Sequence, residues 1–407
     1  MGKTAAEKIL SRASGTDSRA GDVVWGIPDL VYVHDVLGPL VLKSFRAMKA
    51  GQIKYRGKII FIDDHIFPAK DVESSQNALE MKEFARDNKI MFIGNGEGIE
   101  HTLLIENGEI KPGMFVVGSD SHTVTAGAVG AMGVGLGSTD IAALFALGKN
   151  WFRIPESIKV NLIGRMGRYV TGKDVILDII GKIGVDGANY MSMEITAEDY
   201  NMELDDRLAI ANMTVEAGAK DGLVFDSSGD PNEQWFIPDS DSRYASSLSV
   251  DLETLRPKIA LPYSPGNVHD VSEAVGTRVD EVYIGNCANG TLKDLREAAE
   301  VLKGRTVKEG VRMIVVPATR RIYRQAIKEG YIDTFLDAGA TVAPSTCGAC
   351  AGLHMGVLGK GEIAIANTNR NFRGRMGHPD SRVYLANSYV AALAAVEGEI
   401  CDPLEAI

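Results

Sequence analysis

Short apolar runs rich in β-branched residues recur along the chain and alternate with helical stretches. The runs span residues 58–62, 90–93, 114–117, 282–285 and 312–317. Each is bounded by polar residues, glycine or proline, which is typical of buried parallel strands. Between them, segments such as 75–88 and 292–302 carry acidic residues early and basic residues late, as helices favour. This alternation predicts the α/β class with mainly parallel sheets.

The length of 407 residues predicts two or three domains. A proline in Arg153-Ile-Pro-Glu156 precedes a fresh strand at 158–162, and prolines mark a connector from Pro257 to Val268. We therefore expect three α/β domains, at 1–155, 156–268 and 269–407.

The charge balance argues against nucleic acid as a partner. The chain has 43 Lys and Arg against 54 Asp and Glu, a formal net charge of −11, and no basic block. It has no run of eighteen apolar residues and no apolar leader at its N-terminus, so we expect no membrane partner and a soluble, cytoplasmic protein.

Four of the seven histidines lie beside carboxylates or in polar loops at strand ends. They occur in His34-Asp35, Asp64-His65, Glu100-His101 and Asp120-Ser-His122. The second and fourth of these pairs follow apolar runs directly, and ligands bind at the carboxyl ends of parallel strands. A carboxylate tunes a histidine for acid–base work near neutral pH, so this group predicts a catalytic site.

Four cysteines in a chain of this length do not form a disulfide framework. Cys347 and Cys350 form a C-x-x-C pair, and Cys287 lies sixty residues upstream in another strand-end turn. Three thiolates can hold zinc with a histidine as the fourth ligand, or an iron–sulfur cluster with one iron lacking a protein ligand. A thiol–disulfide redox pair is the third alternative.

Two further motifs bear on ligands. The segment Gly167–Asp174 nearly fits a phosphate-binding P-loop, but Asp174 stands where a hydroxyl should hold magnesium and would repel phosphate, so nucleotide binding is not expected. The segment Asn369-Arg-Asn-Phe-Arg-Gly-Arg375 has three arginines in six positions, which suggests a site for a di- or tricarboxylate.

Taken together, these motifs resemble the aconitase superfamily. The specific ones are Gly118-Ser-Asp-Ser-His-Thr123, Asn369 to Arg375, and Cys287 in its Ile-Gly-x-Cys-x-Asn turn with the later C-x-x-C pair. The resemblance runs nearly end to end, and it is to the large subunits of the isopropylmalate dehydratase and homoaconitase branch. It implies three α/β domains with mainly parallel sheets arranged around an iron–sulfur cluster.

The resemblance also implies roles for individual residues. The expected ligands of a [4Fe-4S] cluster, with one iron open, are Cys287, Cys347 and Cys350, whereas Cys401 is expected to be structural. The expected catalytic pairs are His65 with Asp64, His101 with Asp120, and His122 with Glu216. The expected substrate-binding residues are His34, Ser121, Arg370 and Arg375. The expected cluster-lining residues are Asn212, Asn289 and Asn369.

The implied activity is the reversible dehydration of a 2-hydroxy di- or tricarboxylate, with His65 protonating the leaving hydroxyl. The favoured reaction interconverts 3-isopropylmalate and 2-isopropylmalate; homoaconitase and dehydratases of methylated malates are the alternatives. The family usually has Ser before and Thr after its first cluster cysteine, where this chain has Asn286 and Ala288. A small subunit is expected to supply the fourth domain of single-chain aconitases, with its serine base.

Overall fold

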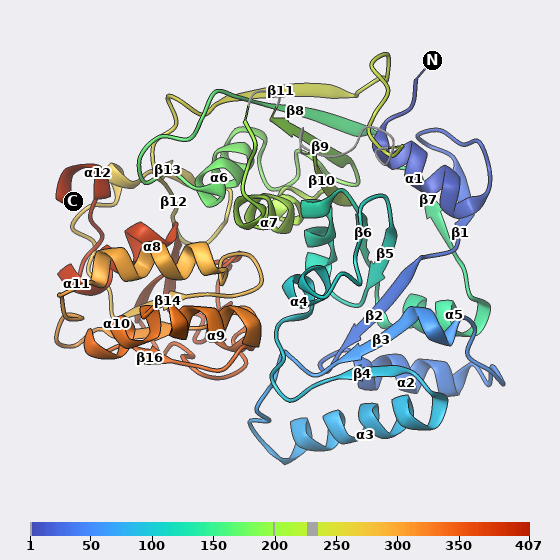
Figure 1. Cartoon of the computed structure of the whole chain (residues 1–407), viewed down its shortest axis with the longest axis horizontal. Helices are drawn as coiled ribbons and strands as arrows, with labels where there is room; N and C mark the ends of the chain where they lie inside the picture. The colour runs from blue at the N-terminus through green and yellow to red at the C-terminus, as the bar shows by residue number, and fades with distance from the viewer. Residues whose placement is uncertain (1, 198–199, 226–234) are drawn as a thin grey trace.

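The computed structural model describes residues 2–197, 200–225 and 235–407 of the chain. Its strands form three larger sheets and a two-stranded ribbon (Figure 1). Almost all neighbouring strands in the three sheets run parallel. The predicted α/β class with mainly parallel sheets is confirmed.

The first sheet has the order β4-β3-β2-β5-β6. Its strands are β2 (Leu30–His34), β3 (Ile59–Ile62), β4 (Met91–Ile93), β5 (Phe115–Gly118) and β6 (Met132–Gly135). The helices of this region are α1 (Ala5–Ser14), α2 (Gly38–Ala47), α3 (Val72–Asn88), α4 (Glu100–Glu106) and α5 (Ser138–Leu147). β1 (Val23–Gly26) pairs antiparallel with β7 (Asn150–Arg153) in the ribbon. Helix α3 begins three residues before the sequence pattern predicts, because Asp71 and Ser74 form a capping box.

The second sheet has the order β10-β9-β8-β11 and is parallel throughout. Its strands are β8 (Ser157–Ile163), β9 (Ser192–Ala197), β10 (Asp221–Phe225) and β11 (Ser246–Asp251). Its helices are α6 (Gly172–Ile183) and α7 (Leu204–Met213), and α7 leads into a 3-10 turn at Thr214–Ala217.

The third sheet has the order β13-β12-β18-β17-β14-β15-β16. Its strands are β12 (Lys258–Ala260), β13 (Val268–Asp270), β14 (Glu281–Ile284), β15 (Arg312–Val315), β16 (Thr341–Val342), β17 (Ile363–Ala366) and β18 (Arg382–Leu385). Its helices are α8 (Leu292–Leu302), α9 (Arg320–Lys328), α10 (Tyr331–Asp337), α11 (Ser388–Glu397) and α12 (Pro403–Ala406).

The segment 257–268, expected to be a connector, contains strand β12 of this third sheet. β12 runs antiparallel to both β13 and β18. Ile259 and Ala260 are fully buried, so their burial, rather than the flanking prolines, decides where this segment packs. The domain boundaries themselves stay a prediction.

One continuous apolar core joins the three regions. It contains Tyr32 from the first sheet, Val160 from the second and Cys347 from the third. Hydrogen bonds cross the same junction. Thr102 Oγ1 donates to the carbonyl of Cys287 at 3.0 Å, and the N–H of Cys347 donates to the carbonyl of Asp64 at 3.3 Å. The carboxyl ends of the first and third sheets are therefore held face to face.

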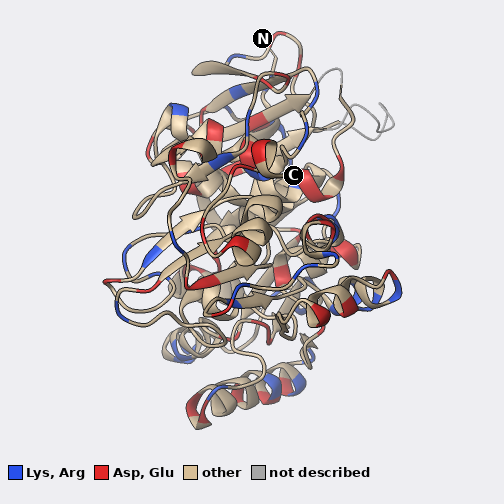
Figure 2. Cartoon of the chain, turned by 90° about the vertical axis from the view of Figure 1, so that its left-hand side faces the viewer, with Lys and Arg blue, Asp and Glu red and all other residues tan. Residues whose placement is uncertain are grey.

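Acidic and basic residues are interspersed over the surface. Figure 2 shows both kinds side by side along the same helices, including α3 at the lower edge of the molecule. No helix in the described ranges is long and apolar enough to cross a bilayer.

Candidate active site

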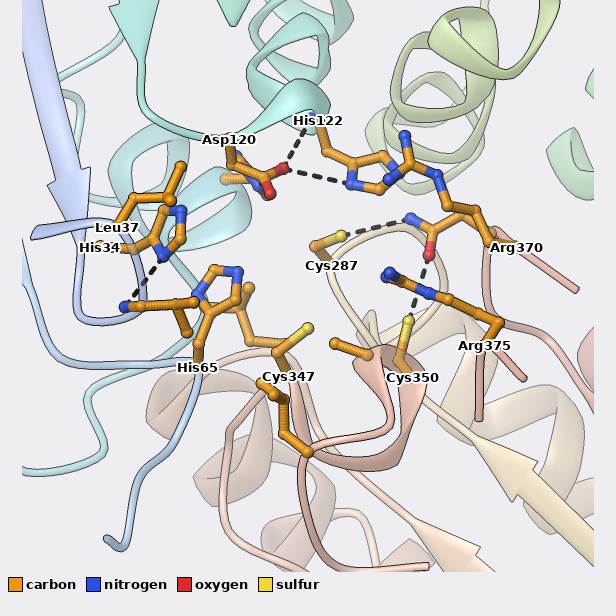
Figure 3. Close-up of a pocket in the computed structure, with 16 residues that line it drawn as sticks. His34, Leu37, His65, Asp120, His122, Cys287, Cys347, Cys350, Arg370 and Arg375 are labelled. Carbon is orange, nitrogen blue, oxygen red and sulfur yellow. Dashed lines mark hydrogen bonds and ion pairs between the residues drawn. The ribbon is translucent and has the colours of Figure 1, made fainter. Parts of the chain in front are cut away.

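A cavity of about 280 Å³ lies where strand ends of the first and third sheets meet (Figure 3). Eleven of the sixteen predicted site residues line it: His34, His65, His101, Asp120, His122, Cys287, Cys347, Cys350, Asn369, Arg370 and Arg375. In Figure 3 the cysteines lie between two histidines on one side and two arginines on the other. The cavity therefore combines thiols, acid–base groups and cations.

His65 is held by a carboxylate directly after strand β3. Its Nδ1 lies 2.7 Å from Oδ1 of Asp64, and Asp35 fixes the loop by accepting hydrogen bonds from the main-chain N–H groups of residues 64–66. Burial alone would lower the pKa of His65, but the charge and hydrogen bond of Asp64 raise it well above its usual range. The pairing with Asp64 therefore favours the protonated form of His65.

His34, the last residue of β2, stacks on His65 with ring centroids 4.1 Å apart. Its Nδ1 accepts a hydrogen bond from the N–H of Val36 at 3.2 Å, so the ring proton resides on Nε2. Burial, together with the charge of His65, lowers the pKa of His34 to about 3. Because Nε2 has no partner among the described residues, His34 is a neutral donor at the cavity wall.

His101 and His122 share one carboxylate, Asp120. Nε2 of His101 lies 3.1 Å from Asp120 and its Nδ1 lies 3.0 Å from the hydroxyl of Tyr32. His122 lies 3.2 Å from Asp120 through Nδ1 and 3.1 Å from Glu216 through Nε2. Burial alone would raise the pKa of Asp120, but the hydrogen bonds of both histidines lower it well below its usual range. All four ring nitrogens of His101 and His122 therefore have hydrogen-bond partners within the chain.

The two arginines differ in their partners. Nε of Arg370 donates to Glu216 at 2.6 Å, and its NH2 group donates to Ser121 at 2.9 Å. Nε of Arg375 is buried without a partner, and no described carboxylate forms an ion pair with this side chain. Arg375 is therefore the cation left to bind an anionic ligand.

The three cavity cysteines are buried, and side-chain amides contact two of them, Cys287 and Cys350. Nδ2 of Asn212 donates to Sγ of Cys287 at 3.1 Å, and Asn369 lies 3.5 Å from the same sulfur. Oδ1 of Asn369 lies 3.2 Å from Sγ of Cys350. Burial raises the pKa of Cys287 to about 12, so a positive partner is needed to make this thiol a thiolate. Cys401 is half-buried outside the cavity and contacts the carbonyl of Glu399.

Comparison with known proteins agrees with this arrangement. Residues 7–228 and 273–398 match the profile of the aconitase family (aconitate hydratase). The chain belongs to the aconitase family. The resemblance predicted from the motifs is thereby confirmed.

Relatives within the family match along nearly the whole chain. The 3-isopropylmalate dehydratase large subunit 2 of Rubrobacter xylanophilus is 48% identical over 99% of this chain and 98% of its own length. The large subunit 1 of the same enzyme from Methanopyrus kandleri is 45% identical over 99% of each chain. Aconitase X of Thermococcus kodakaraensis, in its holo-form, shares the fold with a TM-score of 0.55, at 15% identity over 96% of each chain.

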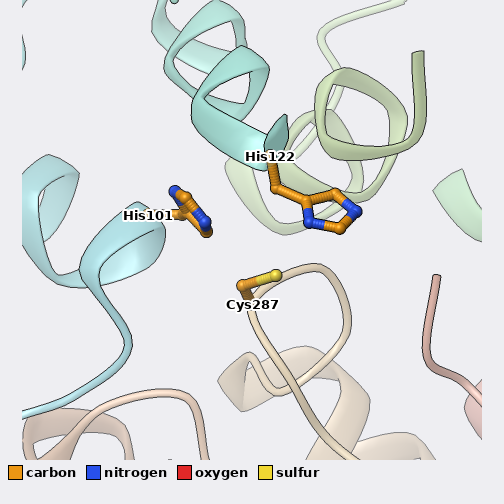
Figure 4. Close-up of side chains that lie close together, drawn as sticks. All are labelled: His101, His122 and Cys287. Carbon is orange, nitrogen blue, oxygen red and sulfur yellow. The ribbon is translucent and has the colours of Figure 1, made fainter. Parts of the chain in front are cut away.

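Membership of the aconitase family implies an iron–sulfur cluster, and the donor set fits one. Cys287, Cys347 and Cys350 line one cavity, and thiolates are the usual ligands of such clusters. Figure 4 shows His101 and His122 beside Cys287, with one potential ligand atom from each within 4.8 Å of the others. The ring nitrogens of both histidines are hydrogen-bonded, so neither His101 nor His122 could bind zinc without losing one of these bonds.

The predicted residues that do not line the cavity are placed behind it, with one exception. Asp64 and Glu216 hold histidines, Ser121 holds Arg370, and Asn212 contacts a cysteine. Asn289 instead donates to Asp294 at the start of α8, and the structure does not bring it to the cavity. Asn286 lies closer, with Nδ2 3.7 Å from Sγ of Cys350 and 3.0 Å from Asn369.

Sequence reasoning assigned no role to Glu100, Tyr32 and Asp35. Glu100 is fully buried, its carboxylate oxygens have no hydrogen-bond partner in the described chain, and its main-chain N–H donates to Asp64 at 2.7 Å. Burial raises the pKa of Glu100 well above its usual range. Glu100 and Asp35 could have been found from the sequence, because each is the neighbour of a predicted site histidine. Tyr32 could not, because it contacts His101 from 69 residues away.

Proposed function

We propose that this chain is the large, cluster-bearing subunit of a hydro-lyase that reversibly dehydrates 3-isopropylmalate and rehydrates the product to 2-isopropylmalate. The observation that carries this proposal is the meeting of three buried thiols, a histidine favoured in its protonated form, and an arginine without a described carboxylate ion pair in one cavity. The two relatives named above support the substrate, since both are named for this dehydratase activity.

Cys287, Cys347 and Cys350 are the proposed ligands of a [4Fe-4S] cluster with one iron free of protein ligands. Bound there, it supplies Lewis acidity toward a substrate hydroxyl. Asn212 and Asn369 donate toward the sulfur of Cys287, and such hydrogen bonds favour thiolate over thiol.

His65 is the proposed general acid. Its Nδ1 is bound to Asp64, so Nε2 is the ring atom left to give its proton to the departing hydroxyl. The raised pKa keeps that proton in place at neutral pH, and Asp64 stabilises the ring in one orientation. The stacked His34 is neutral, so it can donate from Nε2 to a substrate oxygen without releasing a proton.

Arg375 and Arg370 are the proposed sites for substrate carboxylate. Arg375 has no carboxylate partner among the described residues, whereas the charge of Arg370 is balanced by Glu216. Arg375 therefore contributes the attraction, and Arg370, held at two atoms, contributes orientation. His101 and His122 keep Asp120 ionised between them and exclude solvent from that wall.

The base that removes the acidic C–H proton is proposed to come from a small subunit. The relatives are named large subunits, which implies a smaller partner. The cavity residues of this chain give a protonated His65 and a neutral His34, and neither is suited to abstract that proton.

Anaerobic co-purification with the small subunit encoded by the same organism tests this function. We expect a brown complex that interconverts the isopropylmalates, while the large chain alone turns over little or none. Homocitrate, homoaconitate and methylated malates assayed beside isopropylmalate distinguish the alternative substrates. A colourless zinc protein, or full turnover by the large chain alone, would contradict the proposal.

The open iron has a separate test. Brief air exposure should abolish activity while three irons per chain remain, and ferrous iron with a thiol reductant should restore it. Iron content and activity are measured on the same samples through the cycle. Activity that survives loss of the labile iron would rule out the Lewis-acid role.

A further inference from the structure

Lys173 is a fully buried lysine at the start of helix α6. Its side chain is inaccessible to solvent, and no described carboxylate forms an ion pair with its ammonium group. Burying an ammonium group without a counter-ion is unfavourable, so the site must satisfy it in another way.

Three acceptors surround the ammonium group. Nζ donates to the carbonyl of Asn367 at 3.0 Å, to the carbonyl of Thr368, and to Sδ of Met213 at 3.2 Å. An ammonium group has three N–H donors, so its hydrogen-bonding capacity is filled. Lys173 thus ties the second region of the molecule to the third.

The two carbonyls belong to the segment that leaves strand β17 and enters the cavity. The next two residues are Asn369, which contacts the sulfurs of Cys287 and Cys350, and Arg370, which is bound to Glu216 and Ser121. Any shift of the main chain at 367–368 would move both side chains. The carbonyl of Thr368 that Lys173 binds lies one residue before Asn369 and two residues before Arg370.

The ammonium group of Lys173 also interacts electrostatically with one of the cavity thiols. Burial lowers its pKa to about 8, and among the negative groups that favour the charged form Cys350 is the strongest. Arg375, the other cation of this region without a described carboxylate partner, is likewise influenced by Cys350 and Cys347. Lys173 and Arg375 thus both interact electrostatically with Cys350, and Arg375 also with Cys347.

The near match to a P-loop at Gly167–Asp174 finds its explanation here. Asp174 caps helix α6 through the N–H of Thr171 and accepts further hydrogen bonds from Lys258 and Asn387. Lys173 and Asp174, the last two residues of the motif, are fully buried and hold parts of the protein together. Neither is available to a phosphate group.

We propose that Lys173 is a positioning residue: it fixes the main chain that carries Asn369 and Arg370, and it places a buried positive charge behind the cysteine ligands. This inference rests on the proposed function for its catalytic readout and on the proposed cluster for its redox readout, whereas the exchange measurement depends on neither.

The experiment compares Lys173→Met, which keeps the length of the side chain but removes its charge and donors, with Lys173→Gln, which keeps a donor without charge. Lys182→Met is the matched control, since Lys182 lies near the end of the same helix and is exposed. In the chain without cofactor, hydrogen–deuterium exchange at 367–370 should rise in Lys173→Met and stay unchanged in the control.

After reconstitution, Lys173→Met and Lys173→Gln should both bind iron, and the reduction potential of the cluster should become more negative in both, because a nearby positive charge has been removed. With the small subunit present, KM should rise about tenfold in Lys173→Met, equivalent to about 1.4 kcal/mol, with a smaller fall in kcat. Lys173→Gln should show a smaller rise in KM.

Unchanged exchange and potential in variants that fold would overturn the proposal. Failure of both variants to fold while Lys182→Met folds would also overturn it, because Lys173 would then serve the fold as a whole. If the wild-type complex has no dehydratase activity, the proposed function is wrong, whereas exchange and potential still report on Lys173.

Discussion

The two sides of the cavity differ in whether their charged side chains are paired with opposite charges. On the side of the first sheet, the histidines His65, His101 and His122 each contact a carboxylate, so charge is balanced within the chain. On the side of the third sheet, neutral amides contact Cys287 and Cys350. The nearby cations Lys173 and Arg375 form no ion pair with a described carboxylate.

This difference indicates what each side does. Balanced, hydrogen-bonded pairs hold protons at fixed atoms, which acid–base chemistry requires. Unbalanced cations beside thiols favour thiolates, which a metal cluster requires. The histidine side is therefore preorganised by the protein itself, while the cysteine side is complementary to an anionic ligand set.

The largest expected effect comes from the cysteine side. Cys287→Ser, Cys347→Ser and Cys350→Ser should each lose iron, the visible absorbance and all detectable turnover, because a thiolate ligand is removed. Iron analysis and absorption spectra of the reconstituted chains measure this. Cys401→Ser is the control and should keep all three, and equal loss from all four substitutions would refute the ligand assignment.

A substitution on the histidine side should lower turnover without loss of iron. His65→Asn should lower kcat by about 10²- to 10⁴-fold, the usual contribution of a general acid, with unchanged iron content. His269→Asn is the matched control, since His269 lies outside the cavity and pairs with Glu273. Loss of iron in His65→Asn, or turnover equal to wild type, would contradict the assignment of acid–base chemistry to the histidine side and metal binding to the cysteine side.

The pairing of His65 with Asp64 should appear in the pH dependence of stability. Because the folded state raises the pKa of His65, the pair adds stability that is complete below the ordinary value of 6.5 and is lost as pH rises through the raised value. Each unit of elevation corresponds to about 1.4 kcal/mol.

Urea unfolding of the chain without cofactor, at several pH values, measures this contribution. The excess stability of wild type over Asp64→Asn should be greatest at pH 6 and should shrink toward pH 9. An excess that grows with pH would mean that His65 is not held in its charged form.

The smallest effects concern the bonds that join the two sides. Thr346 donates through Oγ1 to the carbonyl of Asp64 at 2.9 Å, and Thr102 donates to that of Cys287 at 3.0 Å. Thr346→Val and Thr102→Val should each lower the free energy of unfolding by about 1 kcal/mol, the usual value of such a bond, and reduce kcat a few-fold. Thr334→Val, the control, removes the hydroxyl hydrogen bond to the carbonyl of Gly330 at the start of α10. It should lower the free energy of unfolding by a similar amount and leave kcat unchanged.

Local pattern predicted much of the fold. The apolar runs at 114–117 and 282–285 coincide with β5 and β14 to within a residue, because burial on both faces leaves a continuous apolar signature. Strand β12 was missed, since three residues between prolines carry too short a pattern to distinguish a strand from a connector.

The sequence by itself determined which chemistry the chain can carry: histidines and cysteines at strand ends, and motifs specific enough to indicate the aconitase family. Only the tertiary structure decided how these groups are paired. His122 meets Glu216 across 94 residues, and Lys173 reaches the carbonyl of Thr368 across 195. Periodicity reports on neighbours along one element, whereas such contacts depend on how separate sheets pack, and the shared core that sets that packing is spread over the whole chain.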